Sequence, residues 1–478
     1  MLANFIDGKW REPEGCRSLP IFNPASGEVI GQTPLCSAAE VSAAAAAAAR
    51  AYPGWAATAV MERTRLMFNY KAVLEGHFEE LAAIITRNHG KTLEEARGEV
   101  RRGIEMVDFA CGAPTLLQGR TLRGVSGGVD QDYYRYPLGV VAGIVPFNFP
   151  VMIPLWMFPL AVVSGNTFVL KPSERTALGA MRLAELFAEA GFPDGVLNLV
   201  HGATDTVNAL LAAPEIRAIS FVGSEPVARH VYQEGARHTK RVQAAGGAKN
   251  HVFVLPDADW DVAIPAIINS AFGNAGERCL AGSVAVAVGD SATQLTQRLE
   301  EAAVRLKLGP GDEPGVDLGP LVADDHRRRV LGHIERAAND GARVVVDGRS
   351  REYLERPGFF LGPTILDRVT PAMAAGRDEI FGPVLSLARV ADVQQAIELV
   401  NRIPLGNMAA VFTGSGRAAR QFRDQVECGM IGINVGVAQP LAFYPFSGWK
   451  SSFYGDLHLQ GSDGIEFYTR KKIVVSRW

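Results

Sequence analysis

The sequence predicts an α/β protein with two domains, each built around a parallel sheet, and a small antiparallel projection. The first observation is length, because 478 residues exceed what one hydrophobic core usually organises. The second is that short apolar runs alternate with helical patterns after residue 139, which is typical of parallel sheets covered by helices. The third is a pair of segments with strand character, 121–136 and 465–476, that fit neither domain.

The first series of strands begins at VVAGIV, residues 140–145. The runs TFVL, VLNLV, AISFV and HVFVL follow, separated by helical patterns at 154–164, 177–190, 205–211 and 226–236. Upstream, the alanine run 43–49 and charged helical patterns over 61–88 and 93–107 predict helices. We therefore assign residues 1–120 and 137–250 to one domain.

The second series follows Cys279. It contains VAVAV, ARVVV and helical patterns near 292–306 and 324–339, with further units to about residue 432. These predict a second α/β domain over 251–432. Residues 121–136 and 461–478 are predicted to form the antiparallel projection, with a role in subunit contact.

Composition excludes several classes of function. The formal net charge is −3 and no long Lys/Arg run is present, which argues against nucleic acid. The short cluster His326–Arg329 is predicted to be a solvated helix face. The N-terminus lacks a signal-peptide pattern, and the longest apolar stretch, 151–163, is too short to span a bilayer. Five widely spaced cysteines form neither a disulfide framework nor a metal site, so we expect a reduced, cytoplasmic protein without metal.

Cys279 ends the glycine-rich stretch FGNAGERC, where a ligand has room to approach the thiol. Taken alone, the pattern is more typical of a buried structural cysteine. Asn148 lies in VPFNFP, directly after a predicted strand. Its amide could donate to a developing oxyanion or could satisfy its own turn, and the motif favours neither interpretation.

Two further motifs suggest a nucleotide site. FVLKPSE places Lys171 and Glu174 after a strand, where they could contact ribose or phosphate, although a surface ion pair is equally common. In ISFVGS, Gly223 lets a ligand approach the backbone, and Ser224 could meet a phosphate or simply cap the next helix. The usual GxGxxG fingerprint is missing.

In order and spacing, PFNFP, KPSE, FVGS, GGAK, GERC and EIFGPV resemble the aldehyde dehydrogenase superfamily, from about residue 5 to 478. The resemblance implies an aldehyde dehydrogenase-like fold: an atypical Rossmann cofactor domain, an α/β catalytic domain and an oligomerisation projection, assembled as a homotetramer. It implies that Cys279 is the nucleophile and that Asn148, with the Cys279 amide, forms the oxyanion hole. The cofactor would be NAD, favoured over NADP by Glu174, and the implied cofactor contacts are Phe147, Lys171, Glu174, Arg175, Gly223, Ser224 and Glu379.

One departure from the family pattern narrows the reaction that we expect. Hydrolytic members carry ELGGK, whose Glu activates the water that releases the acid, but here Ala245, or Ala244 with a one-residue slip, holds that position. GAKNH, KPSER and PFSGWKSSFYGDLH resemble the methylmalonate-semialdehyde (malonate-semialdehyde) dehydrogenase group. Members of that group pass the acyl chain to coenzyme A with loss of carbon dioxide, so they need no such base.

A semialdehyde of this class carries a carboxylate, which a guanidinium group recognises well. The resemblance implies Arg278 for this role, together with Arg102, or Arg101 as the alternative. Phe147, Phe149 and Phe446 are candidates to wall the aldehyde pocket, although core aromatics would look identical in sequence. Two other functions stay open: a hydrolytic enzyme with an unrecognised base, and a catalytically silent NAD-binding protein.

Overall fold

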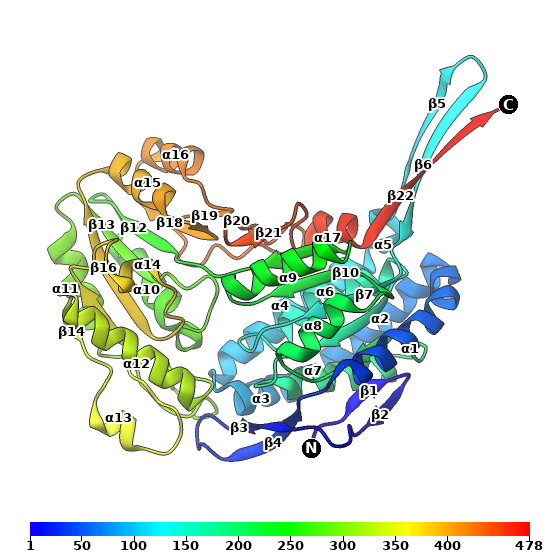
Figure 1. Cartoon of the computed structure of the whole chain (residues 1–478). Coiled ribbons are helices and arrows are strands. Elements are labelled where there is room, and N and C mark those ends of the chain that lie inside the picture. The colour runs from blue at the N-terminus through cyan, green and yellow to red at the C-terminus, as the bar shows by residue number, and fades with distance from the viewer.

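The computed structural model describes residues 1–478 and contains two large sheets, each covered by helices on both faces (Figure 1). The first sheet has the order β2-β1-β9-β8-β7-β10-β11-β21. Its strands are β1 (Asn4–Ile6), β2 (Lys9–Arg11), β7 (Val140–Ile144), β8 (Thr167–Lys171), β9 (Leu197–Leu199), β10 (Ile216–Val222), β11 (Arg241–Ala245) and β21 (Phe453–Tyr454). The five central strands run parallel, as the sequence predicts, whereas β1 and β21 add antiparallel edges that it does not predict.

The helices of this part are α1 (Ala38–Ala57), α2 (Val60–Gly76), α3 (Phe78–His89), α4 (Leu93–Cys111), α5 (Ala113–Leu116), α6 (Met152–Val163), α7 (Ala177–Glu189), α8 (Thr204–Ala212) and α9 (Glu225–Arg237). All twelve residues of α6 are buried, because the helix is apolar on every side and α2, α4 and α17 pack around it. The helical pattern over 61–88 forms two helices that break at His77.

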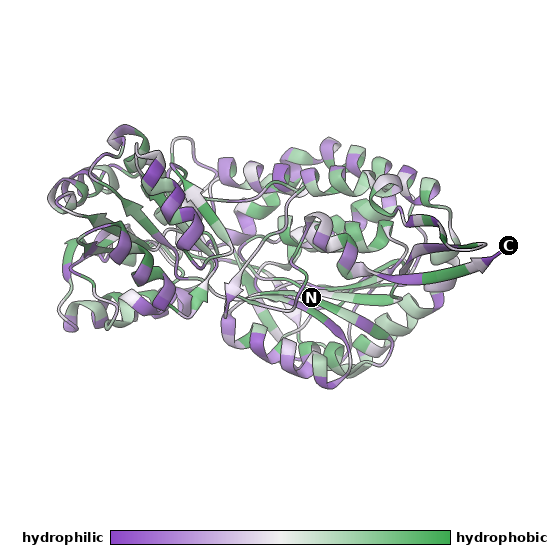
Figure 2. Cartoon of the chain, turned by 90° about the horizontal axis from the view of Figure 1, so that it is seen from above, coloured by the Kyte–Doolittle hydropathy of each residue, from purple (hydrophilic) through white to green (hydrophobic).

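The second sheet has the order β14-β15-β16-β13-β12-β18-β19, and only β14 is antiparallel to its neighbour. Its strands are β12 (His251–Val254), β13 (Val284–Val288), β14 (Arg343–Val346), β15 (Thr364–Asp367), β16 (Val384–Val390), β18 (Met408–Phe412) and β19 (Met430–Ile433). Its helices are α10 (Trp260–Phe272), α11 (Ala292–Ala303), α12 (Asp324–Asn339), α13 (Arg351–Glu355), α14 (Ala374–Arg377), α15 (Val393–Arg402) and α16 (Gly416–Gln425). Seen from above, apolar strands lie inside two lobes and the helices turn polar sides outward (Figure 2).

A three-stranded antiparallel sheet projects from the body (Figure 1). It consists of β5 (Arg120–Ser126), β6 (Val129–Pro137) and β22 (Thr469–Arg477), and its register runs from Thr469 opposite Pro137 to Arg477 opposite Val129. The predicted strand character of 465–468 is wrong, because these residues belong to α17 (Gly461–Tyr468), which packs on α6. Two two-stranded sheets complete the fold: β3 (Ser18–Phe22) with β4 (Val29–Pro34), and β17 (Leu405–Gly406) with β20 (Trp449–Lys450).

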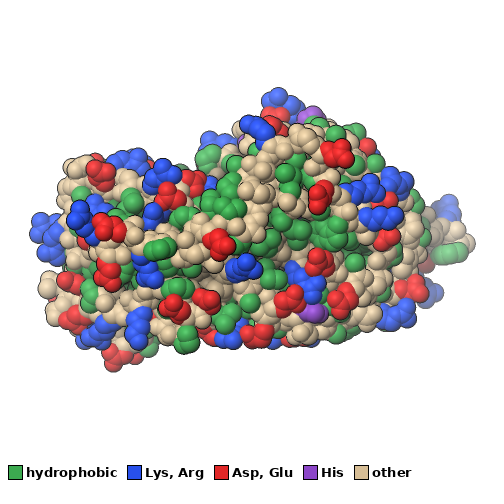
Figure 3. Space-filling model, turned by 90° about the horizontal axis from the view of Figure 1, so that it is seen from below, with side chains coloured by type: hydrophobic (Ala, Val, Ile, Leu, Met, Phe, Trp, Pro, Cys, Tyr) green, Lys and Arg blue, Asp and Glu red, His purple; other side chains and the backbone are tan.

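The surface carries no large patch of one charge sign on the face drawn in Figure 3, where acidic and basic side chains are interspersed. Among the helices, none combines the length and the apolar character that crossing a bilayer requires. The carboxyl ends of β7, β8 and β10 lie next to one another in the first sheet, and the segments that follow these strands face the second domain across a cavity. Ligands of open α/β sheets bind at such an edge.

Candidate active site

A cavity of about 680 Å³ lies at the carboxyl ends of the central strands of the first sheet and reaches the Cys279 loop of the second domain. Phe381, His326 and Arg329 line it from the second domain as well. Most of the site residues predicted from the sequence line this one cavity: Phe147, Asn148, Lys171, Glu174, Gly223, Ser224, Cys279 and Glu379.

The Cys279 loop is held in an unusual backbone shape. After α10, Asn274 and Ala275 adopt left-handed conformations with φ of 58° and 53°. Gly276 has φ +71°, and a Cβ there would lie 2.1 Å from the carbonyl oxygen of Gly382, so only glycine fits. The Cys279 carbonyl then accepts hydrogen bonds from Nδ2 of Asn250 and of Asn407, both at 2.9 Å. The nucleophile candidate is therefore held by two side-chain amides rather than by a regular element.

The protein groups around Cys279 do not activate its thiol. Burial raises its pKa to about 12, the nearby carboxylate of Glu379 acts in the same direction, and Arg278 opposes both. A thiolate, not a thiol, is the nucleophile of cysteine chemistry. The thiol must therefore lose its proton as ligands change its surroundings or as it attacks.

Asn148 lies in the turn between β7 and α6 and points its amide at the Cys279 loop. Its Nδ2 donates to the carbonyl of Glu277 at 2.9 Å, which uses one N–H and leaves the other free. Lys91 donates to the Asn148 carbonyl at 2.7 Å and pairs with the buried carboxylate of Glu99 at 2.6 Å. Glu99 in turn accepts from the backbone N–H of Val151 at 2.8 Å. This buried ion pair fixes the turn, as an oxyanion hole requires.

The cofactor side of the cavity has the groups that a dinucleotide would use. Lys171 Nζ lies 3.3 Å from the Glu174 carboxylate. Burial is the largest single effect on the pKa of Glu174 and raises it, but Lys171, a backbone hydrogen bond and Arg175 together lower the pKa below its ordinary value. Ser224 is the N-cap residue of α9 by position, but its side chain makes no capping hydrogen bond. The free hydroxyl and the N-terminus of α9 therefore remain available to an anion such as a phosphate.

Glu379 is the other carboxylate of the cavity. Its Oε1 accepts from the backbone N–H of Ala248 at 3.0 Å, and burial raises its pKa to about 7. The neighbouring Lys249 donates to the carbonyl of Asp378 at 2.8 Å. The EIFGP and GGAK segments are thus joined directly.

Of the predicted substrate residues, Phe147 lines this cavity, whereas Arg102, Arg278, Phe149 and Phe446 do not. Arg278 contributes to a small neighbouring pocket that Glu379 and Phe381 also line. Phe149 lies under Lys91, with Nζ 4.1 Å from the ring centroid, and Phe446 is a buried core residue that packs on Trp156 at 5.1 Å.

The two candidate arginines of α4 have different surroundings. Arg101 is bound to Glu75 at 2.6 Å and covers the ring of Phe78. Arg102 makes only an i,i+3 pair with Glu105 on its own helix. Arg102 is therefore the freer of the two, and its contact with substrate stays a prediction.

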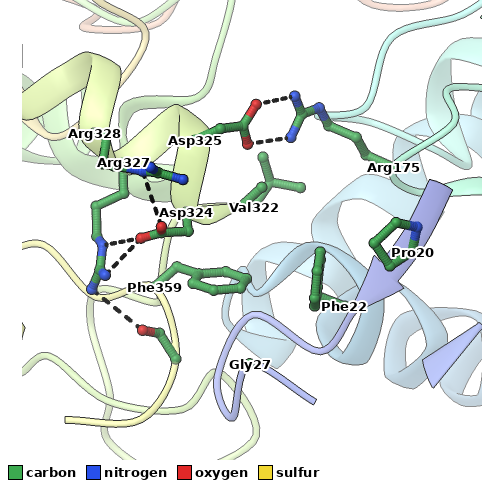
Figure 4. A pocket seen from close by; sticks show the side chains of 12 residues that line it. Pro20, Phe22, Gly27, Arg175, Val322, Asp324, Asp325, Arg327, Arg328 and Phe359 are labelled. Atoms are coloured by element: carbon green, nitrogen blue, oxygen red, sulfur yellow. Dashed lines mark hydrogen bonds and ion pairs between the residues drawn. The ribbon is translucent and has the colours of Figure 1, made fainter. Parts of the chain in front are cut away.

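Arg175 does not line the cofactor cavity. Its guanidinium forms two hydrogen bonds with the carboxylate of Asp325, at 2.8 and 2.6 Å, across a separate surface pocket of about 500 Å³ (Figure 4). Phe22 and Phe359 form the opposite side of that pocket, with ring centroids 5.5 Å apart. Arg175 therefore contributes to a contact between the two domains.

Sequence reasoning missed several residues around the cavity. The prediction of a solvated helix face over His326–Arg329 holds for Arg328 and Arg329, which are exposed, but is wrong for His326, which is buried. Both His326 and Arg329 also line the cavity. His326 Nε2 donates to the carbonyl of Phe381 at 2.7 Å, and Arg329 donates to that of Ile380 at 2.8 Å. The amphipathic pattern of α12 does not reveal this, because the sequence does not show which side of the helix faces the first domain, where Phe147 contacts His326.

Comparisons with known proteins agree with this geometry. The model of the aldehyde dehydrogenase family matches residues 10–474. Malonate-semialdehyde dehydrogenase 1 of Geobacillus thermodenitrificans is 54% identical over 477 residues, covering 100% of this chain and 99% of the relative. The crystal structure of methylmalonate-semialdehyde dehydrogenase from Oceanimonas doudoroffii superimposes with a TM-score of 0.98 at 46% identity, covering 100% of this chain and 98% of the other.

An NAD⁺ complex of an aldehyde dehydrogenase from Bacillus cereus, at 30% identity, superimposes with a TM-score of 0.94 and covers 100% of this chain and 96% of the other. The motifs, the fold and the shared cavity with its cysteine and asparagine all agree with these matches. This chain is therefore an oxidoreductase that belongs to the aldehyde dehydrogenase family.

Proposed function

We propose that this enzyme oxidises a semialdehyde that carries a carboxylate, malonate or methylmalonate semialdehyde, with NAD, and transfers the acyl group to coenzyme A. The names of the relatives support the substrate class, since they are malonate- and methylmalonate-semialdehyde dehydrogenases. The cavity supports NAD because it offers Lys171 and Glu174 for ribose and the α9 N-terminus for phosphate. NAD, when bound there, supplies the acceptor for the hydride.

The observation that carries the substrate assignment is the unpaired guanidinium of Arg278. Burial lowers its pKa, and Glu95 and Cys279 oppose this effect from nearby, although neither is hydrogen-bonded to it. The Arg278 side chain is half-buried, so leaving its guanidinium without a carboxylate partner costs free energy, and a ligand carboxylate would compensate that cost with two parallel hydrogen bonds. Its position next to Cys279 in the chain suits a substrate whose aldehyde and carboxylate are only a few atoms apart.

The residues of the chain would act in the following order. The Cys279 sulfur attacks the aldehyde carbon, and the C=O electron pair becomes an alkoxide. The free N–H of Asn148 and the Cys279 backbone N–H donate to this alkoxide. When the alkoxide re-forms its C=O bond, the hydride leaves and a thioester to Cys279 remains. For a malonyl-type chain, loss of carbon dioxide gives a thioester enolate, which takes up a proton.

Release of the acyl group distinguishes coenzyme A from water. By the resemblance, Ala245, or Ala244 with a one-residue slip, stands where hydrolytic members carry their base; both alanines are buried at the end of β11. Without that base we expect water to release the acyl group about 10²–10⁴-fold more slowly. A thiolate needs no such help, so coenzyme A is the acceptor we propose.

A hydrolytic enzyme remains the second candidate, and one observation favours it. Glu379 lines the same cavity as Cys279, and its pKa of about 7 suits a general base near neutral pH. In this role Glu379 would replace the residue missing at position 245. The two candidates differ in whether turnover needs coenzyme A.

The same proposal includes the assembly of the enzyme and its location in the cell. We propose that the projection mediates assembly into a homotetramer, since β22 exposes Ile473 and Val475, with 61% and 60% of their surface accessible. The assembly would place these apolar side chains against another subunit. We also propose a cytoplasmic location, which suits five unpaired cysteines.

The Arg278→Leu variant tests the substrate assignment. We expect KM for malonate semialdehyde to rise about 10²-fold, the value of a lost charge-assisted pair of about 2–3 kcal/mol, and KM for propanal to change little. Arg101→Leu is the matched control, because it removes an arginine that Glu75 already binds. Steady-state kinetics with both aldehydes give the comparison. An equal loss for propanal and malonate semialdehyde in R278L would refute carboxylate recognition by Arg278.

A further inference from the structure

Three buried titratable side chains, His89, Glu277 and His326, meet beside the cavity and have no part in the steps above. Glu277 Oε2 lies 3.3 Å from Nε2 of His89, and Glu277 Oε1 lies 3.3 Å from Nε2 of His326. The exposed fractions of His89 and Glu277 are 0%, and that of His326 is 9%. They come from the end of α3, the Cys279 loop and the start of α12. We call them the buried His–Glu–His cluster.

The two histidines of this cluster also hold Phe147, the neighbour of Asn148. The His89 ring stacks on Phe147 with centroids 6.1 Å apart, and His326 meets the same ring edge-on at 5.8 Å. The same pair of imidazoles therefore contacts the turn that carries Asn148 and the loop that carries Cys279. A change in the cluster would move one segment relative to the other.

Glu277 connects the cluster to the oxyanion hole through its own main chain. Its carbonyl accepts from Nδ2 of Asn148 at 2.9 Å and from Nδ2 of Asn274 at 2.7 Å. Its side chain is anchored by the backbone N–H of Val322, which donates to Oε1 at 3.2 Å. One N–H of the Asn148 amide donates to the Glu277 carbonyl, so the position of that carbonyl orients the planar amide group. The orientation of the amide in turn fixes where its second N–H points.

The surroundings of Glu277 favour an uncharged carboxyl group. The charged groups that face it are engaged elsewhere: Lys91 with Glu99, Arg175 with Asp325, and Arg329 with the carbonyl of Ile380. Burial raises the pKa of Glu277 well above its ordinary value and lowers that of His89 well below.

The two histidines are uncharged as well. Burial lowers the pKa of His326 to about 4, and its Nε2–H donates to the Phe381 carbonyl. Glu277 Oε2 and His89 Nε2 have no other hydrogen-bond partner and lie 3.3 Å apart. A single proton shared between these two atoms would give both of them a hydrogen bond.

We infer that Glu277 is a positioning residue for the oxyanion hole: a neutral carboxyl, clamped between His89 and His326, that fixes the Asn148 amide. By positioning Asn148, Glu277 affects two steps: the attack of Cys279 on the aldehyde and the departure of the hydride. This role of Glu277 is the same for any aldehyde and does not depend on whether coenzyme A or water releases the acyl group. It is therefore independent of the substrate and acceptor proposed above.

The test compares Glu277→Ala with the nearly isosteric Glu277→Gln. NADH formation in the first turnover is followed by rapid mixing with propanal and no coenzyme A. Alkylation of Cys279 by iodoacetamide, which forms no oxyanion, is measured on the same samples, and thermal unfolding monitors folding. The pH dependence of the first turnover is recorded for the wild type and E277Q.

We expect E277A to slow the first turnover about 10- to 100-fold, less than outright deletion of an oxyanion donor, and to leave alkylation within a few-fold of the wild type. E277Q should restore most of the rate with an unchanged pH profile, because a neutral amide replaces a neutral acid. A wild-type rate in E277A, or equal losses in turnover and alkylation, would overturn the positioning role. An E277Q variant as slow as E277A would overturn the neutral carboxyl.

A second measurement keeps the inference testable even if E277A does not fold. Infrared difference spectra of the wild type and E277Q should contain a C=O stretching band of a protonated carboxylic acid that E277Q lacks. The band should persist throughout the pH range of activity. If the spectra differ only in carboxylate bands, Glu277 is ionised, which would contradict the neutral carboxyl.

Discussion

Replacement of Cys279 by alanine is expected to abolish NADH formation, by more than about 10⁴-fold, because no covalent intermediate can form without the nucleophile. NAD affinity should stay close to that of the wild type, since the other cavity residues remain. Absorbance of NADH measures the loss, and quenching of tryptophan fluorescence by NAD measures binding. The remaining cysteines provide the control: Cys428→Ala, which alters a buried thiol in the core of the second domain, should stay active.

Substantial turnover by C279A would mean that another group attacks the aldehyde. The cavity contains no other cysteine, so such a result would remove the covalent mechanism itself. Loss of NAD binding together with activity would instead indicate a collapsed cavity. In that case the variant would not test the nucleophile.

Replacement of Asn148 by alanine is expected to lower the first-turnover rate about 10²–10³-fold, the usual effect of removing one oxyanion donor. The Cys279 thiol should react with iodoacetamide at a rate close to that of the wild type, since alkylation builds no oxyanion. Asn401→Ala is the matched control, because the Asn401 side chain bonds only to the backbone of residues 425 and 427. Equal slowing of both reactions in N148A would show that Asn148 supports the loop rather than the alkoxide.

Much of the fold could be predicted from the sequence because its central strands are short apolar runs between amphipathic helices. The strands that escaped prediction are short edges such as β1 and β21, of three and two residues, whose pairing depends on distant segments. Residues 465–468 were assigned to a strand because EFY precedes a true strand. Packing of α17 on α6 makes them helical instead, an example of tertiary contacts that override local propensity.

The site was predictable where a motif stands next to a strand end. Asn148, Lys171, Glu174 and Gly223 all follow parallel strands, and they line one cavity with Cys279. The sequence pattern did not reveal His89, because a histidine at the end of an amphipathic helix has no distinguishing neighbours. The prediction that His326 is solvated is wrong for a different reason: the pattern of its helix does not show which side another domain covers. Arg175 follows KPSE directly, but its side chain turns to Asp325 and away from the cavity.

In the mechanism proposed above, a carboxylated semialdehyde acylates Cys279, which then releases the acyl group to coenzyme A. The most direct measurement follows NADH absorbance with enzyme, NAD and malonate semialdehyde, first without coenzyme A and then with it. We predict a burst of about one equivalent per active site that stalls until coenzyme A is added, since acyl-enzyme accumulates when release is slow. Steady turnover without coenzyme A would contradict the account and would point to Glu379 as the base of a hydrolytic enzyme.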